Sequence, residues 1–149
     1  MSQEKDGMSL AHRIRSAGLS VTKIRCAVMR TLISCNRPVR HSDLLTLLQS
    51  DVEVADIDRV TLYRNLDALT RSGLVHSVQG PDNVWRYCAH SEDVDGCPGG
   101  HSHFLCEKCG EMCCLLDSPL PHVHVPEGYV VHNKQMVLQG VCAKCGIAL

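Results

Sequence analysis

Two Cys-x-x-Cys-Gly motifs stand in the C-terminal part of this 149-residue chain, with 32 residues between them. A tight turn closed by glycine sets two thiolates at the separation that zinc ligands require, and two such pairs complete a tetrahedron. A redox Cys-x-x-Cys or a chance match is the alternative interpretation of either motif. Together the motifs predict a structural zinc site formed by Cys106, Cys109, Cys142 and Cys145.

Cysteine and histidine are concentrated toward the C-terminus. Of ten cysteines and nine histidines, eight cysteines fall from Cys88 onward and six histidines from His90 onward. Residues 1–7 lack an apolar stretch behind a basic tip, so we expect no secretory signal and a cytoplasmic location. Thiols stay reduced in the cytoplasm, which favours metal binding over a disulfide scaffold.

Charge divides the chain in a similar way. Residues 1–88 hold 12 Lys and Arg against 9 Asp and Glu, whereas residues 89–149 hold 3 against 7, so the net charge of −1 hides a basic and an acidic half. A Gly- and Asp-rich stretch separates the halves. We therefore expect two small domains, 1–88 and 101–149, joined by a linker over 89–100. No apolar run approaches the roughly 18 residues needed to cross a bilayer, which argues against a membrane protein.

Apolar periodicity predicts three helices in the first domain. The first spans about residues 22–35, with Thr22 as its N-cap. The second opens at His41 and is expected to turn four leucines inward, namely Leu44, Leu45, Leu47 and Leu48.

The third helix begins at an N-cap of Asp56 or Asp58 and runs to about Ser72. Two alternating strands are expected next, at 74–78 and 84–88, joined by a turn that contains Gly, Pro, Asp and Asn. The buried stripe of this helix is predicted to be Leu62, Leu66 and Leu69.

Three helices followed by a β-hairpin define a winged helix-turn-helix. In that architecture the last helix enters the major groove, and residues near its N-terminus contact base edges. The alternative is a solvated helix in an unrelated bundle. The outer face of the third helix carries side chains suited to DNA, namely Arg59, Tyr63, Arg64, Asn65 and Arg71.

A second group of candidate metal ligands lies around the expected domain boundary. His101 and His103 alternate at strand spacing, so their imidazoles point to the same side. Cys88 ends the second predicted wing strand, with His76 upstream and His90 nearby. Ligands drawn from both domains would let metal occupancy control the relative orientation of the domains. For each residue alone, a surface histidine or a buried cysteine is the simpler explanation.

Six stretches of the chain match the pattern of a known family, and they are Val21-Thr-Lys-Ile-Arg25, His41-Ser-Asp-Leu-Leu45, Val60-Thr-Leu-Tyr-Arg-Asn-Leu66, Ser72-Gly-Leu-Val-His76, His101-Ser-His-Phe-Leu-Cys-Glu-Lys-Cys-Gly110 and Gly140-Val-Cys-Ala-Lys-Cys145. Through them the sequence resembles the ferric uptake regulator (Fur) superfamily over nearly its whole length. The resemblance implies an α+β protein, with an N-terminal winged helix-turn-helix DNA-binding domain and a small C-terminal α/β zinc-bound dimerisation domain. It implies a homodimeric, metal-dependent repressor that binds double-stranded operator DNA, with no membrane partner and no small-molecule substrate.

The same resemblance implies roles for particular residues. The recognition helix would be 58–72, and the four motif cysteines would hold structural zinc. A regulatory ion near the hinge would be held by His76, Cys88, His101 and His103. The expected DNA contacts are Arg25, Arg59, Thr61, Tyr63 and Arg64, with further phosphate contacts from Lys23 and Arg71.

Ligand softness favours zinc as the regulatory metal. Iron and manganese sensors would favour imidazole and carboxylate, whereas the thiolate of Cys88 shifts the preference toward zinc. Four N and S ligands make a closed site that suits sensing rather than catalysis. This ligand set resembles the zinc uptake regulator (Zur) branch and implies at least two zinc ions per chain, one structural and one regulatory. A sensor of iron, manganese or peroxide from the same superfamily is the alternative.

The chain departs from the family pattern next to the predicted ligands. Gly100 and Ser102 stand where relatives interleave further ligands, so no additional regulatory site is expected there. Cys113 and Cys114 stand where acidic residues are common. Either Cys114 replaces a carboxylate ligand or both cysteines are small core residues.

The spacer between the two motifs also departs from the pattern. Its prolines predict that the helix expected there is shortened or absent, and they are Pro119, Pro121 and Pro126. Strands are expected around Tyr129–His132 and Gln135–Gln139. The spacer histidines form another metal site or are exposed loop residues, and they are His122, His124 and His132.

Two other classes of function are alternatives to a regulator. A zinc enzyme needs an open coordination position and a general base beside it. The chain has no His-x-Glu with a downstream Pro-Cys-x-x-Cys and no His-Glu-x-x-His, so we expect no enzymatic activity, a thiol oxidoreductase being the other enzyme option. A zinc-stabilised protein-interaction module would show no metal-dependent binding of DNA.

Overall fold

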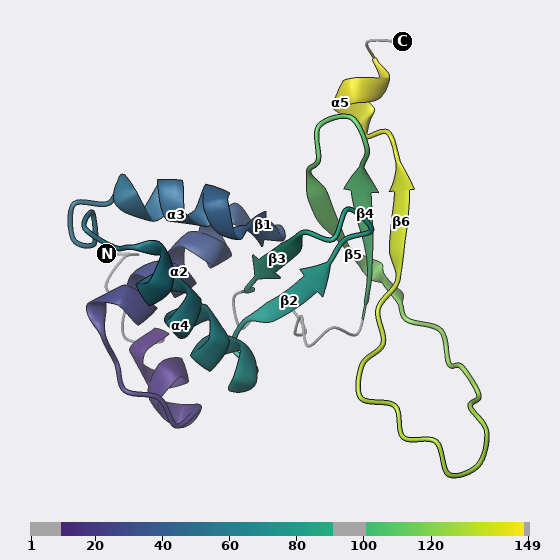
Figure 1. Ribbon diagram of the computed structural model, residues 1–149, viewed down its shortest axis with the longest axis horizontal. Helices are drawn as coiled ribbons and strands as arrows, with labels where there is room; N and C mark the ends of the chain where they lie inside the picture. Colours follow the sequence, from purple (N-terminus) through teal and green to yellow (C-terminus); the bar gives the residue numbers. More distant parts are fainter. Residues whose placement is uncertain (1–9, 91–100, 148–149) are drawn as a thin grey trace.

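The computed structural model describes residues 10–90, here called the N-terminal unit, and residues 101–147, the C-terminal unit (Figure 1). The expected linker falls largely on residues 91–100, which lie outside the described residues. This stretch includes Gly100, one of the two positions where no further ligand was expected. The domain boundaries therefore stay predictions.

Helices build the N-terminal unit around one apolar core. Residues 10–16 are helical and are followed by α2 (Lys23–Cys35), α3 (His41–Gln49) and α4 (Arg59–Arg71). These three labelled helices match the three predicted ones closely. Fully buried core residues come from every helix, among them Ile14, Val28, Leu32, Leu44, Leu62, Leu66 and Leu69.

Side-chain caps explain where two of the helices begin. The Thr22 hydroxyl accepts a hydrogen bond from the Arg25 amide at 3.1 Å, which confirms Thr22 as the N-cap of α2. Asp58, rather than Asp56, caps α4, and its carboxylate accepts from the Thr61 amide at 2.7 Å. Each cap satisfies an amide that would otherwise lack a partner in the first helical turn.

The expectation for the leucines of α3 was only partly correct. Leu44 and Leu48 are fully buried and Leu45 is half-buried, but Leu47 is 44% exposed. Residues four apart define the centre of the buried face, and Leu47 lies about 100° around the axis from Leu48. Leu47 therefore falls at the solvent edge of that face.

A small antiparallel sheet completes the N-terminal unit. It has the order β1-β3-β2, formed by β1 (Val39–Arg40), β3 (Trp85–Cys88) and β2 (His76–Gln79). The β2–β3 hairpin is the predicted wing, although both strands begin later than expected. The three helices and this hairpin form a winged helix-turn-helix.

The C-terminal unit is a second three-stranded sheet. Its central strand β4 (His101–Cys106) pairs antiparallel with β5 (Met112–Pro119) and parallel with β6 (Val137–Gly140). The short helix α5 (Ala143–Gly146) follows β6. The α+β fold class predicted from the sequence is confirmed.

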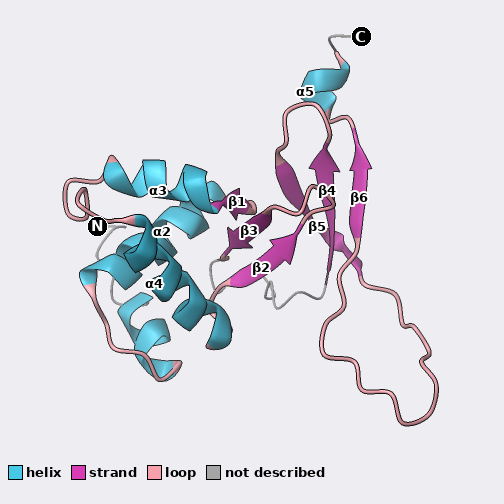
Figure 2. Ribbon diagram, viewed as in Figure 1, coloured by secondary structure: helices cyan, strands magenta, loops and turns pink. Residues whose placement is uncertain are grey.

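A long loop joins β5 to β6 (Figure 2). Residues 120–136 contain neither helix nor strand, in agreement with a helix disfavoured by three prolines. The strand expected around Tyr129–His132 was wrong: these residues pair with no strand and are exposed. The strand expected at Gln135–Gln139 is present as β6, shifted toward the C-terminus.

The two units contact each other through the wing. Val78 of β2 packs against Leu105, Met112 and Val137 of the C-terminal sheet. The Gln135 side chain donates to the Gln79 carbonyl at 2.6 Å. Among the described residues, no helix is long and apolar enough to cross a membrane.

Candidate metal centres and recognition helix

Strand pairing brings the two Cys-x-x-Cys motifs together. Cys106 ends β4 and lies opposite Gly140, the last residue of β6, so the first turn stands beside the start of α5. The Glu107 amide donates to the Gly140 carbonyl at 2.8 Å, which fixes this register. As a result, residues separated by 32 positions become neighbours.

The four motif cysteines form one cluster, here called the four-cysteine cluster. The sulfur atoms of Cys106, Cys109, Cys142 and Cys145 all lie within 4.8 Å of one another. The Cys109 and Cys142 sulfurs are 3.9 Å apart. This is the grouping that the spacing of the motifs predicts, and it provides four sulfur donors on two turns.

The electrostatics of this cluster suit a cation. Backbone amides of Cys109 and Cys142 point at the Cys106 sulfur and lower the pKa of that thiol to about 6. At the opposite extreme, the neighbouring Cys142 thiol, together with burial, raises the pKa of Cys145 to about 12. Four thiols this close cannot all ionise unless a cation balances them, and a tetrathiolate is a preferred ligand set for zinc. The donor set therefore fits zinc.

A second cluster, here called the junction cluster, lies where the wing meets the C-terminal sheet. It comprises two groups of donor atoms, and both groups include the Cys114 sulfur. Within each group, all donor atoms lie within 4.8 Å of one another. One group is Cys88, His90 and Cys114, and the other is His101, His103 and Cys114. The Nε2 atom of His90 lies 3.8 Å from the Cys88 sulfur and 3.7 Å from the Cys114 sulfur.

The predicted junction ligands are only partly brought together. Cys88, His101 and His103 belong to the cluster, but Cys88 and the two histidines stand in separate donor groups. His76 lies outside both groups, with its ring centroid 5.7 Å from that of His103 and 6.5 Å from that of His101. The His76 ring therefore lies beside the two histidines of the cluster without belonging to either donor group.

His90 and Cys114 are the donors that the predicted set left out. Cys114 pairs with His103 across the β4–β5 hairpin, so the turn between the strands fixes its position. Counting outward from the turn at Cys106–Gly110 would have found this pairing. His90 follows Cys88 by two residues, a spacing that can place both side chains on one side of an extended chain.

His103 provides the test of whether this cluster fits a metal. Its side chain is 1% exposed, and neither ring nitrogen has a hydrogen-bond partner within the part of the chain that the structure describes. A buried imidazole without partners is costly. A metal bond to one nitrogen would satisfy it, so the residues present fit a metal ligand set.

Contacts from the N-terminal unit orient His90. Its Nδ1 lies 3.2 Å from the Asn36 side-chain oxygen, and its carbonyl accepts from Arg13 at 3.0 Å. A hydrogen bond at one ring nitrogen sets the tautomer and turns the other nitrogen toward the metal position. In His90 that other nitrogen is the one that faces the two thiols.

The outer face of α4 presents the expected DNA-contacting side chains. Arg59, Tyr63 and Arg64 are exposed, whereas Thr61 is half-buried. Tyr63 stacks on His41 of α3, with ring centroids 4.0 Å apart. Burial lowers the pKa of His41, which keeps this ring neutral at neutral pH.

Two further basic residues of the prediction, Arg25 and Arg71, have partners within the chain. Arg25 donates to the carbonyl and the hydroxyl of Ser20 at 2.7 and 2.6 Å. Arg71 forms an exposed ion pair with Asp67 at 3.0 Å.

A winged helix-turn-helix joined to a small sheet, with two clusters of candidate metal ligands, is the arrangement expected of a metal-responsive transcription regulator. The model of the ferric uptake regulator family matches residues 16–139, and the chain belongs to that family. It is therefore a transcription regulator of the metal-responsive kind.

Two curated relatives agree with this assignment, and a solved structure shares the fold. Transcriptional regulator FurA of Mycobacterium tuberculosis is 28% identical over 143 residues, covering 93% of this chain and 90% of FurA. The peroxide-responsive repressor PerR of Staphylococcus epidermidis is 28% identical over 137 residues, covering 89% and 85%. A solved zinc uptake regulator in complex with zinc and DNA matches with a TM-score of 0.69 at 19% identity, covering 99% of this chain and 97% of that one. The last likeness supports the fold.

Proposed function

We propose that this protein is a zinc-sensing repressor, which binds palindromic operator DNA as a homodimer when zinc occupies the junction cluster. The observation that carries the proposal is the meeting of Cys88 and His90, from the N-terminal unit, with Cys114, from β5. A metal held by ligands from both units would stabilise the one orientation of the units in which these ligands meet.

The ligand chemistry supports zinc over the other metals that this family senses. Two thiols, Cys88 and Cys114, stand among the junction donors, and no carboxylate belongs to either described donor group. Thiolate and imidazole suit zinc, whereas manganese favours carboxylate and water. The alternative is a sensor of iron, manganese or peroxide, and the similarity to FurA and PerR is the observation that favours it.

The proposed metal content is at least two zinc ions per chain. The four-cysteine cluster would hold the structural ion, with Cys106, Cys109, Cys142 and Cys145 as ligands. The junction cluster would hold the regulatory ion, with four ligands drawn from its five donors. His76 is proposed as a neighbour of the regulatory ion rather than a ligand, because it lies outside both donor groups.

DNA recognition is assigned to α4. Its first turns would enter the major groove, where Arg59 and Arg64 reach guanine edges or phosphates and Tyr63 offers a flat apolar contact. Thr61 and Arg25 would lie at the edge of this surface. Lys23 and Arg71 would add phosphate contacts, which makes the affinity dependent on salt.

Dimerisation is assigned to the C-terminal unit. Apolar side chains on its strands and loop are exposed in the single chain, among them Leu116, Leu138, Val123 and Tyr129. A second copy that covers this surface would remove it from water. Two recognition helices related by a two-fold axis match a palindrome. A repressor of this kind acts in the cytoplasm, which is the location we propose.

The mechanism is a shift between orientations of the N-terminal units. Zinc at the junction would supply bonds that join the wing strand to the C-terminal sheet. Cys88 and His90 then hold the end of β3 against β5, and the spacing of the two α4 helices becomes fixed. Operator affinity rises because the competent orientation is more populated.

The test is operator binding by Cys88→Ser at saturating zinc, with Cys26→Ser as the control because Cys26 lies on α2 outside both clusters. We expect the first variant to lose the zinc response and the control to keep it. Wild-type affinity with a wild-type zinc response in Cys88→Ser would sink the proposal.

A further inference from the structure

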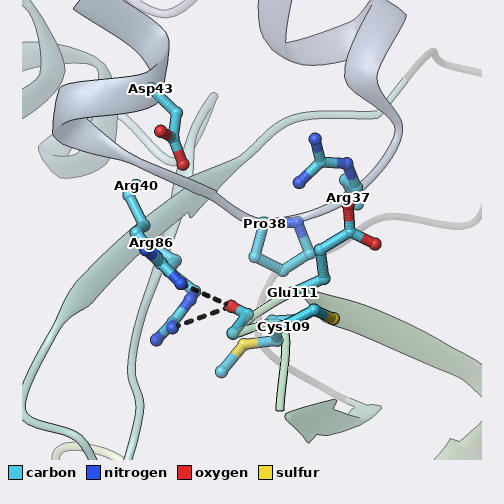
Figure 3. A pocket seen from close by; sticks show the side chains of 9 residues that line it. Arg37, Pro38, Arg40, Asp43, Arg86, Cys109 and Glu111 are labelled. Atoms are coloured by element: carbon cyan, nitrogen blue, oxygen red, sulfur yellow. Dashed lines mark hydrogen bonds between the residues drawn. The ribbon is translucent and has the colours of Figure 1, made fainter. Parts of the chain in front are cut away.

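Two arginines of the N-terminal unit converge on one carbonyl of the C-terminal unit. The Nη2 atoms of Arg40 and Arg86 donate to the Gly110 carbonyl oxygen at 3.0 and 3.1 Å (Figure 3). Gly110 directly follows Cys109 of the four-cysteine cluster. The carbonyl therefore ties the turn that presents two sulfur donors to the N-terminal unit.

The position of Arg86 is tightly determined. Its side chain is 1% exposed, and it forms a two-bond ion pair with Asp82 at 2.7 and 3.1 Å. A buried guanidinium must be paired, so this geometry is costly to change. Asp82 lies in the turn of the wing. Through Arg86, the Gly110 carbonyl is connected to the tip of the wing.

The pairing of Arg40 with Arg86 calls for an explanation. They are direct register partners on β1 and β3. Like charges directly opposite each other destabilise a sheet. Here one carbonyl accepts from both guanidinium groups, and Asp82 balances one charge. The shared acceptor therefore accounts for two arginines that an isolated wing would not favour.

The contact of Arg40 with the Gly110 carbonyl requires glycine at position 110. Its φ is +74°, a conformation that glycine adopts readily, and a Cβ atom built on it would collide with Nη2 of Arg40. Any other residue would push Arg40 away from the carbonyl. The Gly110 amide also donates to the Cys106 carbonyl at 2.9 Å, so the turn of the four-cysteine cluster fixes the direction of the peptide.

We propose that the Gly110 carbonyl is the docking point through which the four-cysteine cluster orients the DNA-binding unit, with Arg40 and Arg86 as positioning residues. Arg40 precedes α3, and the next residue, His41, stacks on Tyr63 of the recognition helix. The cluster thus has a direct mechanical link to the DNA-reading surface in addition to any structural role. The consequence for DNA affinity rests on the proposed function, whereas the docking itself does not.

The cavity beside this contact supplies a matched control. It has a volume of about 260 Å³ and is lined by Arg37, Arg40 and Arg86 together with residues of the first cysteine turn. Arg37 belongs to the same surface, yet no hydrogen bond joins it to Gly110 among the described residues. Arg37→Met removes a charge at the same place without removing the docking contact.

The experiment compares Arg40→Met with Arg37→Met, and Gly110→Ala with Gly128→Ala, in zinc-loaded dimers. Gly128 has a φ of +86°, and a methyl group added there would meet only open space, so its variant controls for backbone strain. Each protein is assayed for zinc content, for radius of gyration by small-angle X-ray scattering, and for affinity to promoter DNA. Arg86 is left unchanged because breaking its buried pair would threaten folding.

We expect Arg40→Met and Gly110→Ala to raise the radius of gyration and to weaken DNA binding about tenfold or more, the range of one lost charge-assisted hydrogen bond. Arg40→Met is expected to keep its zinc, and the two controls are expected to behave as wild type. Scattering and affinity unchanged in Arg40→Met would overturn the proposal. A second result would also overturn it. In that result Arg40→Met binds DNA more weakly, but Gly110→Ala keeps its zinc and has the same scattering and DNA affinity as Gly128→Ala. Arg40 would then act directly on DNA phosphate and not through the Gly110 carbonyl. If wild-type protein shows no zinc-dependent DNA binding, the proposed function fails, and the scattering comparison still decides the docking role.

Discussion

The imidazole of His41 stacks on the ring of Tyr63, with centroids 4.0 Å apart and an angle of 21° between the planes. His41 opens α3, and Tyr63 lies on the outer face of α4 with 51% of its surface exposed. One face of the tyrosine ring is thus held by the protein while the rest remains accessible. Tyr63 is ordered before it meets a ligand, which lowers the entropic cost of binding.

We predict that His41→Ala lowers the affinity of the protein for operator DNA, because Tyr63 loses the ring that holds it in place. Ordering one side chain on binding costs about 0.5–1.5 kcal/mol, and without the stack Tyr63 would pay that cost when it meets DNA, so the loss is expected to be about two- to tenfold. His41→Phe keeps a flat ring and is expected to retain most of the affinity. Fluorescence anisotropy with labelled operator DNA measures both variants. Equal affinities for the alanine and phenylalanine variants would show that the stacking has no role in binding.

The stability of the protein is predicted to depend on pH through the same residue. Burial is the main cause that lowers the pKa of His41 below its ordinary value of 6.5. A hydrogen bond with the Arg59 backbone opposes this shift, and the charge of the Arg59 side chain adds to it. Below that value the unfolded chain binds more protons at this position than the folded chain does. The contribution of His41 is therefore present above pH 6.5 and is lost as the pH falls.

His41→Phe isolates this effect from the pH dependence of the metal sites. The free energy of unfolding in urea would be measured for both proteins at a pH above 6.5 and at a pH below it. We expect wild type to lose more stability on acidification than His41→Phe does. Parallel pH profiles for the two proteins would contradict the assignment.

The N-cap of the recognition helix gives a stability prediction. Asp58→Ala removes the carboxylate that accepts from the Thr61 amide, and it should cost about 1 kcal/mol, within the usual range of about 0.5–2 for such caps. Asp56→Ala is the matched control, since Asp56 is exposed and does not cap α4. Urea unfolding monitored by circular dichroism compares the two. A larger loss for Asp56→Ala would mean that the cap is wrongly assigned.

Adjacent cysteines on β5 test the junction cluster. Cys114 belongs to both donor groups, whereas Cys113 is exposed and belongs to neither. We predict that Cys114→Ser lowers the zinc affinity of the junction cluster at least tenfold, while Cys113→Ser leaves it unchanged. Competition with a chromophoric chelator measures the affinity, and total zinc bound after dialysis provides the control for the four-cysteine cluster. The reverse order of effects would remove Cys114 from the site.

Local sequence signals predicted much of this molecule. Thr22 and the stripe of Leu62, Leu66 and Leu69 are recognisable because capping and helical periodicity act within a few residues. The four-cysteine cluster was predictable because each turn fixes two sulfur atoms on its own and a tetrahedral zinc site needs two such pairs, although strand pairing is what brings the turns together. Leu47 and the exposed segment at 129–132 were wrongly assigned, since apolar residues in a short window do not reveal what will cover them.

The junction cluster depends on contacts that short windows do not contain. His90 meets Cys114 only because the end of β3 lies against β5, and the Gly110 carbonyl meets Arg40 only across the two units. Strand pairing and the packing of Val78 against the C-terminal sheet create these neighbours. The residue types indicated a metal site at the junction, but the fold determined which donors stand together.

The most direct test of zinc sensing is a gel shift on the protein's own promoter, titrated separately with zinc, iron and manganese. A chelator would first remove metal from the junction cluster, under conditions that leave one zinc ion bound per chain at the four-cysteine cluster. We predict that zinc restores a dimer-sized complex at a lower free metal concentration than either other metal does, and that Cys88→Ser does not respond. Restoration by iron or manganese with no response to zinc would contradict the assignment of this regulator as a zinc sensor.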